Sequence, residues 1–248
     1  MNDIRFILFD AANTLIHKPT LWDKMLQALA AHNIHVDAAL LKQRHKLVSE
    51  LIFFPDNTSA TFYKTFNSEL LYSLGIIPND ALLNDVFKAC TYLGWVPFED
   101  TEVLKQLPLD KGILSNFNSS LFEKINNMFS GMFSTVVVSE QLKCAKPSMD
   151  FYAQAVQMIG HKPEHILYIG DSIKLDMEPA LNTGMNVLLI DREDCFPYVP
   201  HRIKSLNEIL QNELNILKQN ENVLLSVQRI ETPKENRKSF HTIYIDRY

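Results

Sequence analysis

Arg5-Phe-Ile-Leu-Phe-Asp10-Ala-Ala-Asn-Thr14-Leu-Ile16 is the stretch that decides the fold of this chain. Four apolar residues, Phe6 to Phe9, run without a polar break, which is typical of a parallel strand covered on both faces. The run ends at Asp10, and small or turn-forming residues follow it. A carboxylate in a tight turn after a buried strand lies where open α/β sheets place their chemistry. An Asp that merely caps a turn would give the same local pattern, so the other strand ends decide between the two interpretations.

Composition describes an ordinary globular protein: 248 residues, 46% hydrophobic and 21% charged. This length allows one large domain or a core with an inserted second domain. A net charge of −5 without a long basic run gives no reason to expect nucleic acid or an anionic membrane as partner. Cys90, Cys144 and Cys195 show no CxxC spacing, so neither a zinc site nor a disulfide framework is indicated. Without a recognisable signal segment or an apolar run of about 18 residues, we expect a cytoplasmic protein.

Apolar residues recur at helical spacing from residue 17 to residue 96, and no convincing strand interrupts them. The pattern predicts four consecutive helices, near 20–29, 37–54, 62–74 and 80–93, with a break at 55–58. Thr20 is expected at the N-cap of the first helix. Four helices in a row between alternating segments predict a separate small bundle.

From residue 95 onward, short strands alternate with helices. We expect strands near 112–116, 133–139, 165–171 and 186–191, and helices at 120–129, 147–159, 177–183 and 205–217, with Pro147 in a first turn. The alternation predicts an α/β fold with a doubly wound parallel sheet. Residues 218–248 differ in composition and could form added edge strands or a docking arm, and both possibilities stay open.

Four of the predicted strand ends carry polar groups: Asp10 with Thr14, Ser115 with Asn116, Lys146 after its loop, and Asp171 with Asp176. In a parallel sheet these ends meet at one edge. Three carboxylates there would repel one another unless a cation lay among them. Oxygen ligands without a nearby His or Cys favour Mg²⁺.

The remaining groups at this edge suit a phosphoryl group. Lys146 offers a positive charge, Ser115 a hydroxyl donor, and the turn after Asp10 a set of backbone amides. A carboxylate whose charge a metal ion offsets can attack bound phosphorus and form an aspartyl-phosphate.

In this order, the segments resemble the four motifs of the haloacid dehalogenase-like (HAD) hydrolase superfamily over roughly residues 4–217. The motifs read Phe-Asp10-Ala-Ala-Asn-Thr14-Leu, Ile-Leu-Ser115-Asn, Lys146-Pro-Ser-Met-Asp-Phe-Tyr and Ile-Gly-Asp171-Ser-Ile-Lys-Leu-Asp176. The helical insertion resembles the family's type-one cap, which closes over the site and selects substrate. The resemblance implies a core of residues 1–16 and 97–217, a cap of residues 17–96 and a tail of residues 218–248.

The resemblance also implies a role for each matching residue. Asp10 would be the nucleophile and a metal ligand, and Thr14 would orient it. The backbone carbonyl of Ala12 and the carboxylate of Asp171 would be further metal ligands, and Asp176 would support the metal site. The groups implied to hold the substrate's phosphoryl end are Ala11, Ala12, Ser115, Asn116 and Lys146.

The chain departs from the family's phosphatases at Ala12, where they carry an Asp that acts as general acid. Such an acid typically contributes about 10²–10⁴-fold, so hydrolysis with an alkoxide-type leaving group should be slow unless another residue supplies the proton. The candidates are His17, Lys24, His32 and His45. A second departure, Asn13 for the usual Gly, is mild because Asn tolerates the left-handed conformation.

Two groups of the superfamily carry Ala at this place. The phosphonoacetaldehyde hydrolases use a cap lysine as a Schiff base, for which Lys24, Lys42, Lys46 and Lys64 are available. The rhythmically-expressed-gene-2-like group fits the general architecture better. The 2-haloacid dehalogenases fit poorly, since they carry an aromatic residue at the Ala12 place and lack the Gly-Asp171-Ser pattern.

We therefore expect a Mg²⁺-dependent HAD-like hydrolase that transfers a phosphoryl group from a small phosphorylated metabolite to Asp10 and then to water. Two alternatives remain: a binding protein or weakly active enzyme that keeps the phosphate pocket, and a phosphonate (carbon–phosphorus) hydrolase with a cap lysine. The sequence gives neither the substrate nor the oligomeric state.

Overall fold

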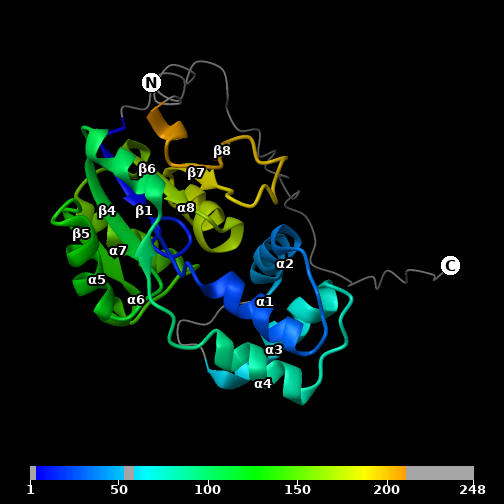
Figure 1. Ribbon diagram of the computed structural model, residues 1–248. Coiled ribbons are helices and arrows are strands. Elements are labelled where there is room, and N and C mark those ends of the chain that lie inside the picture. The colour runs from blue at the N-terminus through cyan, green and yellow to red at the C-terminus, as the bar shows by residue number, and fades with distance from the viewer. Residues whose placement is uncertain (1–3, 53–58, 211–248) are drawn as a thin grey trace, which may run out of the picture.

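The computed structural model describes residues 4–52 and 59–210, and these form a parallel sheet with helices on both faces and a group of helices beside it (Figure 1). The expected break at 55–58 and the tail at 218–248 lie outside the described residues, as does the end of the helix expected at 205–217.

The strand that contains Phe6 to Phe9 lies inside the sheet. The strand order is β5-β4-β1-β6-β7-β8, and every pairing is parallel. The strands are β1 (Phe6–Phe9), β4 (Asp110–Ser115), β5 (Thr135–Val138), β6 (Ile166–Gly170), β7 (Asn186–Ile190) and β8 (Arg202–Ile203). Phe9 is in register with Ile113 on one side and with Ile169 on the other, so the three central strands end side by side. The predicted α/β fold with a doubly wound parallel sheet is confirmed.

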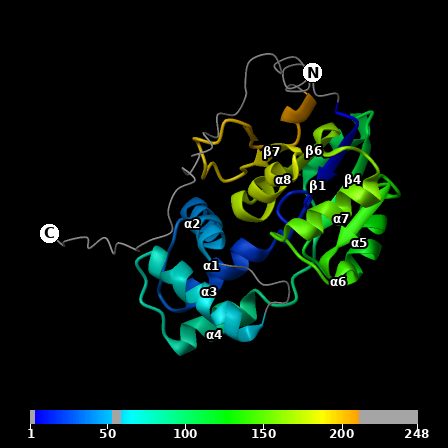
Figure 2. The same ribbon diagram turned by 180° about the vertical axis from the view of Figure 1, so that it is seen from behind.

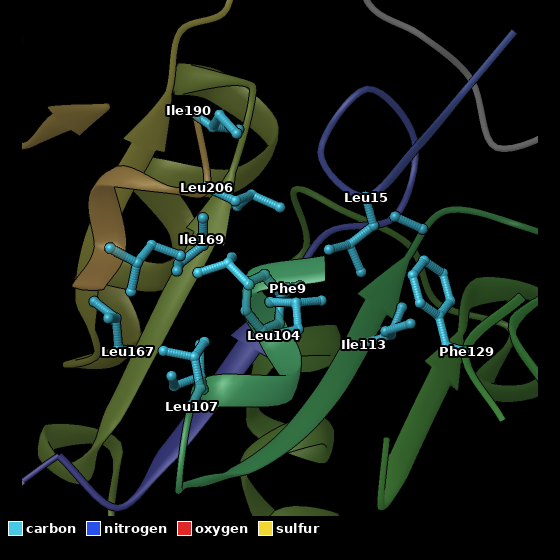
Figure 3. Packing of buried hydrophobic residues seen from close by; sticks show 14 of the residues in the cluster. Phe9, Leu15, Leu104, Leu107, Ile113, Phe129, Leu167, Ile169, Ile190 and Leu206 are labelled. Carbon is cyan, nitrogen blue, oxygen red and sulfur yellow. The ribbon is translucent and has the colours of Figure 1, made fainter. Parts of the chain in front are cut away.

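Side chains of β1 alternate between two apolar layers, which explains why its sequence has no polar break. Ile7 and Phe9 face the layer formed with the 3₁₀ helix η1 (Glu99–Gln106) and α5 (Ser120–Phe129). In Figure 3, Phe9 lies among Ile113, Ile169 and Leu104. Phe6 and Leu8 face the other layer, formed with α7 (Met149–Ile159) and α8 (Glu178–Thr183).

The four helices expected before residue 96 are α1 (Leu21–Ala31), α2 (Ala38–Leu51), α3 (Ala60–Ser73) and α4 (Asp80–Ala89). They have an apolar core of their own, which includes Leu29, Leu41, Phe66, Leu70 and Val86. Figures 1 and 2 show them as a group set apart from the sheet. The predicted inserted helical region is confirmed, whereas its boundaries at 17 and 96 stay a prediction.

Two short strands join where the chain leaves the sheet domain and where it returns. β2 (Ile16–His17) pairs antiparallel with β3 (Val96–Pro97), and the amide of Phe98 donates to the carbonyl of Leu15 at 2.9 Å. The two crossings are therefore tied to each other by backbone hydrogen bonds.

Several elements differ from the sequence expectation. The strands β2, β3 and β8 span two residues each, which is too short for an alternating pattern. The unexpected helical turns are η1, α6 (Ser139–Leu142), η2 (Pro163–His165) and the π-helix η3 (Ile173–Met177). α7 begins at Met149 with Ser148 at its N-cap, so Pro147 precedes the helix and does not form its first turn. Thr20 does occupy the N-cap position of α1, but its side chain makes no capping hydrogen bond.

The three cysteines are free thiols. Among the described residues, no helix combines the length and the apolar character that crossing a membrane would need.

Substitution of Leu8 by Ala tests the central position of β1. Leu8 is fully buried in the layer formed with α7 and α8. The variant should therefore lose about 2–5 kcal/mol of unfolding free energy through lost burial and the cavity left behind. Urea denaturation measures the loss. Ile77→Ala is the control, because Ile77 is 83% exposed and should change stability by less than about 0.5 kcal/mol. Equal losses in both variants would contradict the placement of Leu8.

Candidate active site

The carboxyl edge of the sheet brings together the acidic and basic groups that the sequence placed at strand ends. The Lys146 ammonium lies 2.6 Å from Asp10 Oδ1 and 2.7 Å from Asp176 Oδ1, and all three side chains are buried. The Ser115 hydroxyl lies 3.4 Å from Asp10 Oδ1. Residues more than a hundred positions apart thus form one buried cluster at the carboxyl edge of the same parallel sheet.

The carboxylate of Asp176, for which the sequence predicted a supporting role, has several hydrogen-bond donors besides Lys146. The Tyr168 hydroxyl donates to its Oδ1 at 2.8 Å, and the Ser172 amide donates to its Oδ2 at 3.0 Å. A Cβ on Gly170 would lie only 2.4 Å from the Asp176 Cγ, so glycine is the residue that lets this carboxylate approach the strand. Tyr152 donates to the Leu175 carbonyl in the same turn.

Asn116 fixes the loop that carries Lys146. Its side-chain amide donates to the Lys146 carbonyl at 3.1 Å, and its side-chain oxygen accepts from the Lys146 amide at 2.7 Å. Asn116 is therefore a brace between two motif loops in this structure, and its predicted substrate contact stays a prediction.

The turn after Asp10 closes on the carbonyl of Ala11, which accepts from the amides of Leu15 and Ile16. Asn13 has φ +60°, the left-handed conformation that the sequence allowed for. The Thr14 hydroxyl is buried and has no hydrogen-bond partner among the described residues, so its predicted role in orienting Asp10 stays a prediction. The same holds for the substrate contacts of Ala11 and Ala12.

Three carboxylates face one point at this edge. Ligand atoms of Asp10, Asp171 and Asp176 lie within 4.8 Å of one another. Burial raises the pKa of Asp10 to about 7, although the Lys146 ammonium opposes the rise. Burial likewise raises the pKa of Asp171, against the opposing effect of Lys46. Ionised carboxylates are thus held together at a cost in solvation and repulsion, and a cation bound among them would relieve it.

The acidic side chains at the site outnumber the basic ones. Lys46 of α2 reaches from the cap to Asp171 Oδ2 at 2.9 Å and to Glu50 Oε1 at 3.0 Å. Four carboxylates therefore face two ammonium groups, Lys46 and Lys146, which leaves two negative charges uncompensated. One divalent cation carries the matching charge, and the all-oxygen donor set is of the kind that hard cations prefer. The residues present fit such an ion, and the Ala12 carbonyl stays a predicted further ligand.

Sequence reasoning named Lys46 as one of four available cap lysines but could not select it. The Lys46 and Glu50 spacing of four residues indicated neighbours on a helix, yet nothing in the sequence showed that they would meet Asp171. Glu50 Oε2 also accepts from the Lys174 amide at 3.2 Å. The cap thus contacts both ends of the turn after β6.

The other proposed proton donors lie elsewhere. His45 packs edge-on against Trp22 and Phe66 in the cap, and burial lowers its pKa to about 4, so it is neutral at pH 7. His32 lies 2.9 Å from Asp85 of α4. His17 stacks on Phe98 with ring centroids 4.1 Å apart, and Lys24 is exposed. Within the part of the chain that the structure describes, no hydrogen bond or ion pair joins these four side chains to the strand-end cluster.

Arg192, after β7, is a residue that the sequence did not single out. Its guanidinium donates to the carbonyls of Asn13 and Thr14 at 3.3 and 2.8 Å, and it pairs with Asp100 at 2.7 Å. It also lies 3.8 Å from the centre of the Phe98 ring. Arg192 therefore braces the turn that follows Asp10 against the crossing from cap to core.

Asp100 completes this brace. Its carboxylate also accepts from the Ser205 hydroxyl and the Leu206 amide. Burial by itself would raise the pKa of Asp100, but Arg192 and these donors bring it below its usual value.

Replacement of Arg192 by Met should leave the partly buried Asp100 carboxylate unpaired. We expect a loss of about 2 kcal/mol of unfolding free energy at pH 7, below the roughly 3–5 kcal/mol of a fully buried pair. Because the pKa of Asp100 is depressed in the folded state, the pair's contribution is present above about pH 4 and is lost as pH falls further. Urea denaturation at pH 7 and pH 3.5 should show the gap to wild type shrinking in acid.

Lys105→Met is the matched control, since Lys105 pairs with Glu102 on the exposed surface and should cost less than about 1 kcal/mol. A gap for Arg192→Met that is the same at both pH values would contradict the assignment to Asp100.

Comparisons with known proteins agree with the geometry. The chain is 25% identical over 209 residues to the glyceraldehyde 3-phosphate phosphatase of Methanothermobacter thermautotrophicus, which covers 77% of this chain and 87% of that protein. The enzyme of the same name from Methanocaldococcus jannaschii is 28% identical over 123 residues, and there the match spans 46% of this chain and about half, 54%, of the relative. The (S)-2-haloacid dehalogenase of Xanthobacter autotrophicus is 25% identical over 196 residues, 76% of each chain.

A solved structure shares the fold. The HAD-hydrolase YfnB from Bacillus subtilis, bound to magnesium, aligns with a TM-score of 0.59 and 20% identity over 84% of this chain and 98% of that one. The sequence model of the haloacid dehalogenase-like hydrolases matches residues 4–184. That span contains β1, the inserted helices and all four strand-end motifs, and the chain belongs to the haloacid dehalogenase-like hydrolase family.

Proposed function

We propose that the protein is a Mg²⁺-dependent phosphatase that hydrolyses a small phosphorylated metabolite through an aspartyl-phosphate at Asp10. The observation that carries the proposal is the buried Lys146 ammonium between Asp10 and Asp176, with Asp171 completing a three-carboxylate cluster. A nucleophile, a group of carboxylates suited to a cation and a positive charge for phosphate thus meet at one edge of the sheet. Its phosphatase relatives support a small phosphorylated substrate.

In this proposal, Asp10 attacks phosphorus and water later hydrolyses the acyl phosphate. Lys146 and Ser115 bind phosphoryl oxygens, together with the amides of the Ala11-Ala12 turn. Asp10, Asp171 and the Ala12 carbonyl would hold Mg²⁺, with support from Asp176. When bound, the ion would offset the negative charge on the carboxylates and the phosphoryl group.

Dehalogenases are also among the relatives, and the choice between the two reactions rests on the cation site. Asp171 and Asp176 add two carboxylates beside Asp10, which suits chemistry on an anionic phosphoryl group through a divalent ion. The Gly-Asp171-Ser pattern fits the phosphatase side, and Ala12 stands where the dehalogenases carry an aromatic residue. Both features also support placement in the rhythmically-expressed-gene-2-like group, which remains part of the proposal.

The carbon–phosphorus alternative needs a neutral cap amine for Schiff-base formation. Lys46 is the cap lysine that reaches the site. Burial alone would lower its pKa, but the Asp171 and Glu50 carboxylates raise it well above the usual range. The amine is therefore held protonated, which disfavours this alternative. The binding-protein alternative predicts that the wild-type protein does not hydrolyse an activated phosphate ester.

The first test is hydrolysis of 4-nitrophenyl phosphate, whose leaving group needs no protonation. Asp10→Asn should reduce kcat by at least about 10³-fold, because the attacking oxygen is lost. Asp80→Asn makes the same chemical change on the exposed cap surface and should leave kcat unchanged. Wild-type activity no higher than that of Asp10→Asn would favour the binding-protein alternative. A binding protein would still be stabilised against unfolding by added inorganic phosphate.

The second test is thermal unfolding with and without Mg²⁺ at pH 5.5 and pH 8. The pKa of Asp10 is raised to about 7, so its favourable protonated form is lost as pH rises through that value, and the metal-free protein should become less stable. Mg²⁺ binds the ionised carboxylates. The Mg²⁺-induced rise in Tm should therefore be larger at pH 8 than at pH 5.5.

The matched variant for this test is again Asp80→Asn, which should behave as wild type, while Asp10→Asn should show a smaller Mg²⁺ effect. A rise in Tm that does not depend on pH, or that Asp10→Asn leaves intact, would argue against metal binding by this cluster.

A further inference from the structure

Lys46 is a cap cation placed at the catalytic edge of the core. Its ammonium lies 2.9 Å from Asp171 Oδ2, and Asp171 belongs to the carboxylate cluster around Asp10. The side chains of Lys46, Asp171 and Glu50 are only 13%, 15% and 10% exposed. The cap therefore places one positive charge a single carboxylate away from the nucleophile.

The Lys46 ammonium has a donor to spare. A lysine ammonium carries three N–H donors, and Asp171 and Glu50 are the two acceptors that the described residues supply to it. Glu50 is fixed in turn, because its second oxygen accepts from the Lys174 amide. The ammonium also lies 6.0 Å from the centre of the Phe196 ring. It is thus held in position from two sides by carboxylates, which leave one of its N–H groups for a ligand.

Lys46 reaches the carboxylate cluster from the cap and not from the core. Displacement at phosphorus proceeds roughly in line, so the leaving oxygen lies opposite the attacking oxygen. Lys146 and Ser115 contact Asp10 from the core, whereas Lys46 comes from α2 of the cap. Three other cap groups that could donate are directed elsewhere: His45 toward Trp22 and Phe66, His32 toward Asp85, and Lys64 toward Asp80.

We propose that Lys46 is a catalytic residue that donates a hydrogen bond to the leaving-group oxygen, and that the substrates are phosphate esters of aliphatic alcohols. This inference rests on the proposed phosphatase function. An alkoxide is a poor leaving group, and with Ala12 in the turn after Asp10 the core side offers it no donor side chain at that place. A fixed ammonium stabilises the charge that develops on this oxygen.

The step balances as follows. A bond forms between Asp10 Oδ and phosphorus while the bond between phosphorus and the ester oxygen breaks. The ester oxygen keeps the electron pair, and its developing negative charge is met by the Lys46 N–H. The alcohol takes up one proton from solvent, and the water that attacks the aspartyl-phosphate returns one.

The test compares Lys46→Met with wild type on a series of aryl phosphates of rising phenol pKa and on glycerol phosphate. The Lys46 donor matters most where most charge develops on oxygen, so kcat/KM for glycerol phosphate should fall by about 10²-fold, the usual cost of one lost oxyanion donor. For 4-nitrophenyl phosphate, the fall should stay within about threefold, because that leaving group needs little stabilisation. The dependence of rate on leaving-group pKa should steepen accordingly.

Lys64→Met is the matched control: it removes the same charge from the cap, at a pair exposed to solvent, and should leave the whole series unchanged. Lys46→Arg keeps a cationic donor and should restore most of the glycerol phosphate rate. If Lys46→Met does not fold, Lys46→Gln, a weaker neutral donor, should show the same selective loss.

A fall of equal size on every substrate would assign Lys46 to holding the cap in place and would overturn the inference, as would no fall at all. A different result would contradict the proposed function itself: wild-type protein that hydrolyses 4-nitrophenyl phosphate no faster than Asp10→Asn does. Active wild type with an unchanged leaving-group dependence in Lys46→Met would therefore refute the role of Lys46 alone.

Discussion

The buried contact of the Lys146 ammonium with Asp10 and Asp176 is the constraint on which the rest of the site depends. A buried lysine without partners would be strongly destabilising, and so would two neighbouring carboxylates without a cation. Each charge therefore requires the others, and the fold must place three strand ends within a few ångströms. Asn116 fixes this arrangement through hydrogen bonds with the Lys146 backbone, and Tyr168 does so by donating to the Asp176 carboxylate. Gly170 provides the space.

The same constraint leaves the site with more negative than positive charge. Lys146 offsets part of the repulsion within the core, and Lys46 adds a second positive charge from the cap. The remaining two negative charges and the raised pKa of Asp10 have one physical origin, namely carboxylates held close together away from water. A bound cation and the Lys46 contact from the cap would thus both reduce the repulsion among the same carboxylates.

Much of the fold and of this cluster could be predicted from the sequence. Phe6 to Phe9 form a strand because both of their neighbouring layers are apolar, and Asp10, Ser115 and Asp171 follow strands whose ends a parallel sheet must align. Lys46 and Arg192 could not be selected in the same way. Their partners lie 125 and 178 residues away, and only the packing of the cap and of the loop after β7 brings them together. β8 was missed since two residues carry no periodicity.

The division of labour between core and cap follows from where the charges lie. Core groups such as Lys146 and Ser115 contact Asp10 and can address only the phosphoryl end of a substrate. That end is common to all phosphate esters, so these groups provide no selectivity among them. In the proposed mechanism, the organic end meets α2, where Lys46 is fixed by Glu50. Because Ala12 supplies no acid, selection of the leaving group and stabilisation of its charge fall to the same cap side chain. A change at Lys46 should therefore alter specificity and rate together.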